Sequence, residues 1–191
     1  IIIGSHDGWL SAIEAESGRF RWRRNLGSMI RASAAVVADS DPRANGTSPG
    51  RPRPSAYVAS YGDYLWRIDG DTGRVEWKKW LPRHVWARGR GVVSSPIVAD
   101  VDGDGRLEVV VGTRSWRVFC VAAETGQLRW WRGFDYGVDS TCTATDIDGK
   151  PALLLGTGES LYGPGDCAVV ALWGADGSSC WRAQLGGGVD S

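Results

Sequence analysis

Short apolar runs separated by glycine- and aspartate-rich turns form the main pattern of the chain. Typical runs are "AAVVA" (34–38), "VVV" (109–111), "ALLL" (152–155) and "AVVAL" (168–172). Long stretches of helix-forming residues with apolar positions every three to four residues are absent from the sequence. The pattern predicts an all-β protein made of short strands, several of them apolar on both faces.

One phrase occurs four times, with a glycine four residues before a tryptophan. The copies are "SAIEAESGRFRW" (11–22), "WRIDGDTGRVEW" (66–77), "FCVAAETGQLRW" (119–130) and "VALWGADGSSCW" (170–181). The pairs are Gly18 and Trp22, Gly73 and Trp77, Gly126 and Trp130, and Gly177 and Trp181. A repeat of about 50 residues with four strands in each unit is typical of a β-propeller.

The third unit shows the expected blade most clearly. Its strands are predicted at 92–100, 107–112, 116–123 and 127–132. The whole chain then divides into 1–33 (the last three strands of a blade), 34–91 (a blade with an inserted loop at 42–55), 92–137, 138–185, and a lead-in to a further blade at 186–191. Nearly four blades are therefore expected, and the rest of the propeller or a second copy is needed to close the ring.

Each Gly–Trp pair has a structural interpretation. The hairpin between the last two strands of a blade needs a residue that accepts positive φ, which favours glycine. The indole on the last strand is large enough to fill the wedge between neighbouring blades. We therefore expect these eight residues to build the fold and not to bind a ligand.

These phrases resemble the tryptophan-docking motif of the PQQ-like, or quinoprotein-type, β-propellers. The first copy is similar through Ala12, Glu14, Ser17, Gly18 and Trp22, and the later copies keep the glycine and the tryptophan. The resemblance covers the whole chain and implies about half of a seven- or eight-bladed ring. The family contains both dehydrogenases and non-catalytic scaffolds, so the resemblance does not fix an activity.

The acidic stretch "DVDGDGRLE" (100–108) is a candidate calcium site. Calcium takes six to eight oxygen ligands, which acids at alternate positions of a loop can supply. The predicted ligands are Asp100, Asp102, Asp104, the carbonyl of Arg106, and Glu108. The stretch resembles the calcium loop of FG-GAP-type blades, and the alternative is an acidic turn that needs no ion. Copies at Asp39 and Asp146 are degraded, so one structural site is expected.

A basic and aromatic stretch, "KKWLPRHVWARGRG" (78–91), is the candidate binding surface. In an up-and-down blade it lies on the face opposite the calcium loop. The predicted binding residues are Arg83, His84, Trp86, Arg88, Arg90, Arg114 and Trp116. Basic residues among aromatics suit a protein partner or a small anionic ligand. The alternative is a solvated loop whose tryptophans pack on neighbouring blades.

Charge and composition narrow the function classes. The 22 basic and 22 acidic side chains cancel, which disfavours nucleic acid as a partner, and no apolar run has the roughly 20 residues of a membrane span. The four cysteines lack metal-site spacing and are expected to be buried apolar residues.

We therefore expect a non-catalytic binding or scaffold module outside the cytoplasm, where calcium is plentiful. One alternative is a fragment of a PQQ-dependent dehydrogenase. Such enzymes typically have two adjacent cysteines against the cofactor, and this sequence has no such pair, which weighs against PQQ. Another alternative, suggested by the many aromatic residues, is a carbohydrate- or cell-surface-binding protein.

Overall fold

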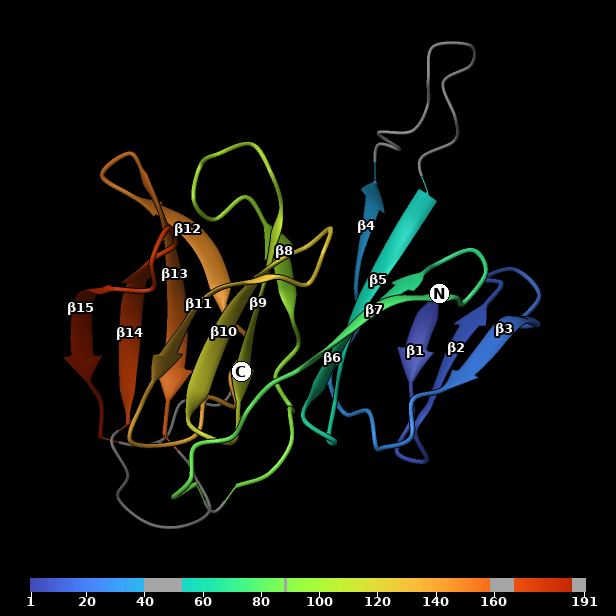
Figure 1. Cartoon of the computed structure of the whole chain (residues 1–191), viewed down its shortest axis with the longest axis horizontal. Helices are drawn as coiled ribbons and strands as arrows, with labels where there is room; N and C mark the ends of the chain where they lie inside the picture. The colour runs from blue at the N-terminus through green and yellow to red at the C-terminus, as the bar shows by residue number, and fades with distance from the viewer. Residues whose placement is uncertain (40–52, 88, 159–166, 187–191) are drawn as a thin grey trace.

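The computed structural model describes residues 1–39, 53–87, 89–158 and 167–186. Over these residues the chain forms fifteen strands in four antiparallel sheets, and no helix occurs among them. The predicted all-β fold is confirmed: the sheets follow one another as the blades of a partial β-propeller, from β1–β3 to β12–β15 (Figure 1).

Each sheet is a meander in which consecutive strands are neighbours. The first sheet has three strands: β1 (Ile2–Gly4), β2 (Trp9–Ile13) and β3 (Phe20–Asn25). The second has β4 (Ala35–Asp39), β5 (Arg53–Ser60), β6 (Tyr64–Asp69) and β7 (Val75–Trp80). The third has β8 (Ile97–Ala99), β9 (Glu108–Thr113), β10 (Arg117–Ala122) and β11 (Leu128–Gly133). The fourth has β12 (Thr143–Ile147), β13 (Lys150–Thr157), β14 (Ala168–Trp173) and β15 (Ser179–Gln184).

Two strand boundaries differ from the predicted ones. The first strand of the third sheet was expected over 92–100, but β8 has only three residues. Pro96 directly before it has no backbone N–H to donate to a ladder, and Ser94 instead donates its hydroxyl to the Gly112 carbonyl at 2.7 Å. In the second sheet, β5 begins at Arg53, inside the expected loop 42–55; residues 40–52 of that loop lie outside the described residues.

The core lies between the sheets. One apolar cluster fills the space between the third and fourth sheets, another lies between the second and third, and a smaller one lies between the first and second. The two middle strands of each four-stranded sheet are mostly buried, and all six residues of β9 are buried. The innermost strands β8 and β12 are only partly buried, and the outer strands β3, β11 and β15 are mostly exposed. Burial on both faces explains why the middle strands have continuous apolar runs in place of alternation.

The last hairpin of every sheet is built in the same way. The glycine of each Gly–Trp pair has φ of 69° or 70°, a left-handed conformation that a side chain disfavours. The strand pairing shifts register just beside the hairpin in all four sheets, as a β-bulge does. In the first three sheets the tryptophan that follows this hairpin donates its indole N–H to the next sheet.

Candidate functional site

The acidic loop between β8 and β9 brings three carboxylates together. Oxygens of Asp100, Asp102 and Glu108 all lie within 4.8 Å of one another. Both oxygens of Asp100 accept backbone N–H groups of the loop, from Gly103 at 2.7 Å and from Gly105 at 2.9 Å. These bonds hold the loop in a tight turn, so the carboxylates are positioned by the backbone.

Glu108 is the unusual member of this group, since its side chain is 1% exposed. Its Oε2 accepts the Val101 N–H at 3.2 Å, whereas its buried Oε1 has no hydrogen-bond partner. Burial raises the pKa of Glu108 above its ordinary value. A buried carboxylate oxygen without a hydrogen bond is costly, so a cation beside it would be stabilising.

Asp104, a predicted ligand, pairs with the side chain of Arg106, whose predicted ligand atom is its carbonyl. The guanidinium of Arg106 donates to Asp104 through Nε at 3.0 Å, and this hydrogen bond holds the pKa of Asp104 below its ordinary value. Asp104 therefore faces a side-chain cation and is not among the three clustered carboxylates. It can join an ion only if this pair opens.

Arg129, on the outer strand β11, was not anticipated from the sequence. Its guanidinium lies 3.7 Å from Glu108 Oε1 and 3.9 Å from Asp104 Oδ2. It is a second positive charge at the acidic loop, in addition to Arg106. The three carboxylates fit a hard cation that prefers oxygen ligands, and Arg129 opposes such an ion.

A cavity of about 350 Å³ adjoins the acidic loop. Asp102 lines it together with Lys150, Trp173 and Asp176 of the fourth sheet. The Lys150 ammonium lies 5.7 Å from the Trp173 ring centre. The β12–β13 turn of the fourth sheet corresponds to the acidic loop of the third, and Lys150 directly follows this turn.

The opposite end of the sheets carries an aromatic cluster, which we call the loop face: His84, Trp86, Trp116 and Tyr136. The rings of His84 and Trp116 stack with centroids 5.5 Å apart, and Tyr136 follows at 6.4 Å from Trp116. Trp86 is 77% exposed. In Figure 1 the β7–β8 connection that holds His84 and Trp86 runs along the lower end, whereas the β8–β9 loop lies at the upper end.

Backbone strain accompanies the loop face. Trp116 has φ of 67°, which is rare for a bulky residue and places its ring against His84. A Cβ at Gly89 would lie 2.6 Å from the Arg114 carbonyl oxygen, so this connection approaches the β9–β10 turn closely. Residues with strained backbone dihedral angles are concentrated at functional sites, such as surfaces that hold a ligand.

Two of the predicted binding arginines are already paired. Arg83 lies 3.3 Å from Asp63, and Arg114 lies 3.2 Å from Asp139. Arg90 is exposed, and Arg88 lies outside the described residues. The sequence shows a run of positive charge, but the fold brings in carboxylates from other turns that offset much of it.

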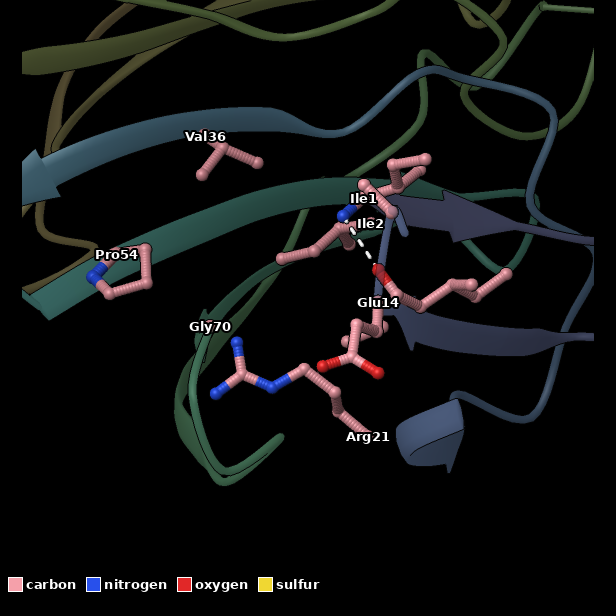
Figure 2. Close-up of a pocket in the computed structure, with 10 residues that line it drawn as sticks. Ile1, Ile2, Glu14, Arg21, Val36, Pro54 and Gly70 are labelled. Atoms are coloured by element: carbon pink, nitrogen blue, oxygen red, sulfur yellow. Dashed lines mark hydrogen bonds between the residues drawn. The ribbon is translucent and has the colours of Figure 1, made fainter. Parts of the chain in front are cut away.

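A further cavity, of about 530 Å³, lies beside β1, between the first and second sheets. Figure 2 shows Ile1 and Ile2 on one side and Val36 and Pro54 on the other, with Glu14 and Arg21 below. Within the described residues β1 pairs only with β2, whereas β5, β9 and β13 each have an inner neighbour. The cavity thus lies at the edge of β1, on the side where the other three sheets have a fourth strand.

No helix in the described residues is long and apolar enough to cross a membrane. The four cysteines are free thiols, and Cys120, Cys142 and Cys167 are buried. Burial raises the pKa of Cys142 to about 12, as expected of an inert core residue.

Comparison with known proteins identifies the repeat. A family model described as outer membrane protein assembly factor BamB matches residues 6–101, half of the chain. No curated protein matches the sequence.

Solved structures share the fold at low sequence identity. BamB from Moraxella catarrhalis is 17% identical with a TM-score of 0.62, over 96% of this chain and 46% of that one. Quinohemoprotein alcohol dehydrogenase ADHIIG from Pseudomonas putida HK5 is 16% identical with a TM-score of 0.69, over 97% and 32%. The computationally designed Ika8 protein is 14% identical with a TM-score of 0.66, over 99% and 48%.

This chain therefore spans between a third and a half of the length of these structures. At such identities the likeness shows the fold and no activity. The matched family model, together with the four Gly–Trp hairpins, shows that the chain belongs to the PQQ-like repeat family of β-propellers.

Proposed function

We propose that this chain is a non-catalytic binding module whose partner is a protein segment held on the loop face. The observation that carries the proposal is a row of rings, in which His84 stacks on Trp116 and Tyr136 is tilted against Trp116, together with the exposed Trp86 on the same connection as His84. Exposed aromatic side chains are the anchors that protein interfaces favour.

The paired charges support a protein segment over a small anion. Asp63 and Asp139 offset Arg83 and Arg114, so within the part of the chain that the structure describes, which leaves out Arg88, the exposed Arg90 is the predicted binding arginine that lacks an ion pair. An anionic ligand needs unpaired donors, whereas an aromatic or apolar segment needs the open ring faces.

Selection of displayed random peptides on the immobilised chain tests this surface. We expect selected peptides to lose binding to Trp86→Ala and to keep it with Trp80→Ala, a control that removes another exposed indole, which lies on β7 and is 56% exposed. Peptides that bind both variants alike would place the partner elsewhere. Competition by inorganic phosphate would favour the small anionic ligand.

The acidic loop has a structural part in this proposal: one calcium ion bound by Asp100, Asp102 and Glu108 stabilises the β8–β9 turn. The buried Oε1 of Glu108, which has no hydrogen bond, is the observation in favour. We expect calcium to raise the unfolding temperature of the wild type relative to chelator. Asp102→Ala should remove that rise. Asp146→Ala, which alters the equivalent turn of the fourth sheet, should keep it.

A calcium-loaded propeller of this family fits an extracytoplasmic location, which belongs to the same proposal. The matched family is described as an outer membrane protein assembly factor, and calcium is plentiful outside the cytoplasm. Expression of the full-length gene product, followed by fractionation of the cell, tests the location.

The dehydrogenase alternative has one supporting observation, namely the likeness to quinohemoprotein alcohol dehydrogenases. The sequence has no two adjacent cysteines, and the acidic loop lies on the end away from the loop face. A dye-linked assay with added PQQ, calcium and a primary alcohol distinguishes the non-catalytic binding module from the dehydrogenase fragment. Turnover above the cofactor-only control would contradict the non-catalytic proposal.

A further inference from the structure

Both ends of the β7–β8 connection, which carries His84 and Trp86, are fastened to one residue, Asp63. At the start of the connection the Leu81 N–H donates to the Asp63 carbonyl at 2.8 Å. At its end the Gly91 N–H donates to Asp63 Oδ1 at 3.0 Å. The connection therefore has its two ends close together, as in an Ω-loop, a kind of loop that frequently carries function.

Asp63 lies in the β5–β6 turn, where its φ of 63° is one that aspartate tolerates better than most residues do. The other carboxylate oxygen, Oδ2, lies 3.3 Å from the Arg83 guanidinium, so both oxygens act on the connection. A Cβ at Gly91 would lie 2.6 Å from the Tyr61 ring, which shows how closely the connection approaches this turn. Asp63 is only 9% exposed and is thus not placed to contact a partner itself.

The middle of the connection has little packing of its own. Val85 is 84% exposed and Trp86 is 77% exposed, whereas the His84 ring stacks on Trp116 of the third sheet. Segments with few buried apolar contacts open locally at a low cost in free energy. The positions of His84 and Trp86 therefore depend on how the ends of the connection are held.

Two hydrogen bonds to the third sheet also hold the connection, one near each end. The Pro82 carbonyl accepts a hydrogen bond from Arg117 Nη1 at 2.7 Å. The Gly91 carbonyl accepts one from the Arg114 N–H at 3.3 Å. Each of these bonds acts on one end, whereas Asp63 acts on both and ties the connection to the second sheet.

We propose that Asp63 is a positioning residue for the loop face: its carboxylate holds the connection so that His84 and Trp86 meet a partner in one arrangement. The inference rests on the proposed function, because it names the residue that shapes the surface which that function uses. A loop that is already held in its bound conformation loses less conformational entropy when a partner docks. Removal of the carboxylate therefore weakens binding although Asp63 does not touch the partner.

Two substitutions separate the effect of the carboxylate from that of the backbone. Asp63→Gly removes the side chain and accepts the φ of 63°, whereas Asp63→Asn keeps an oxygen for the Gly91 N–H. Hydrogen–deuterium exchange of the backbone amides measures how firmly the connection is held. We expect the Gly91 amide to exchange nearly as fast as in an unstructured peptide in Asp63→Gly, and to stay protected in Asp63→Asn.

The affinity for a peptide selected on the wild-type loop face is the second readout, which a purely structural role of Asp63 would not move. Apparent affinity falls with the fraction of molecules in the binding-competent conformation, so we expect a loss of roughly threefold to tenfold in Asp63→Gly. Asp63→Asn should bind as the wild type does. Asp148→Gly, a matched change at a φ of 51° in the β12–β13 turn, should leave both exchange and affinity unchanged.

Protection of the Gly91 amide that survives in Asp63→Gly would overturn the inference, and so would lost protection with unchanged peptide affinity. Asp63→Ser, which shortens the side chain by one atom, repeats the test if Asp63→Gly does not fold. A wild type that binds no selected peptide would contradict the proposed function instead. The exchange measurement needs no peptide, so it still decides whether Asp63 holds the connection.

Discussion

At the scale of single residues, the three clustered carboxylates of the acidic loop face the guanidinium of Arg129, while Arg106 pairs with Asp104. Arg129 lies 3.7 Å from the buried oxygen of Glu108, where an ion would also be attracted. Because both are positive, the arginine and the ion compete for the same charge. At the proposed calcium site, the side chain from β11 would therefore lower the affinity for the ion.

We predict that Arg129→Gln strengthens calcium binding by roughly threefold to tenfold, a change worth up to about 1.4 kcal/mol. Isothermal titration of calcium into the purified variant measures it. Arg132→Gln is the control, since Arg132 acts on Asp176 of the fourth sheet and should leave the affinity unchanged. An unchanged affinity in Arg129→Gln would show that the arginine moves away without cost.

Asp63 provides a pH-dependent prediction on the loop face. Burial raises the pKa of Asp63 above its ordinary value of 3.8, against the opposing effects of the Gly91 N–H and Arg83. A raised carboxyl pKa means that the folded state holds the proton more tightly than the unfolded state does. This contribution to stability is present at low pH and is lost as pH rises from 3.8 through the raised pKa.

Asp63→Asn mimics the protonated form, keeps an oxygen for the Gly91 N–H, and tolerates the φ of 63°. We predict that the free energy of unfolding of the variant, relative to the wild type, increases as pH rises across that range. Urea unfolding at a series of pH values checks it. A difference that decreases with rising pH would mean that the ion pair with Arg83 outweighs burial.

At the scale of elements, the hairpin glycines are not equivalent. Gly18 and Gly126 share a φ of 69°, but only Gly126 lies beneath an indole, the ring of Trp77. We predict that Gly18→Ala costs about 1 kcal/mol, through the backbone alone. Gly126→Ala should cost that amount plus roughly 1–3 kcal/mol for displacing the ring.

Chemical unfolding of both variants measures the difference. Equal costs would mean that the Trp77 ring shifts freely, and that its contact with the Gly126 hairpin does not fix how the second sheet packs on the third.

The sequence predicted these elements well where the signal is local. A glycine four residues before a tryptophan marks a turn and an outer strand within a dozen residues, and the four hairpins occur where expected. The innermost strands were harder to predict from the sequence. The length of β8 depends on Pro96 and on a hydroxyl of Ser94 that bonds across the sheet to Gly112, which is a contact between strands and not a pattern along one.

At the scale of the whole molecule, the sequence predicted those parts of the candidate site that come from one loop. It did not predict the parts that come from separate strands and turns. Asp100, Asp102 and Glu108 come from one loop, so their alternation pointed to the cluster. Arg129 comes from another strand of the same sheet. The partners of Arg83 and Arg114, Asp63 and Asp139, come from other turns. These charges come together only when the sheets pack. The carboxylates then offset the arginines, so the surface that was predicted to be basic is largely aromatic.

The account depends most on the claim that the buried carboxylate of Glu108 takes part in binding a cation. Titration of calcium into the chelator-treated wild type and into Glu108→Gln tests it directly, because glutamine keeps the shape and removes the charge. We predict one ion bound per wild-type chain and none bound by the variant. Absence of binding by the wild type, or equal binding by both proteins, would contradict the account and leave the acidic loop as a turn closed by its own backbone.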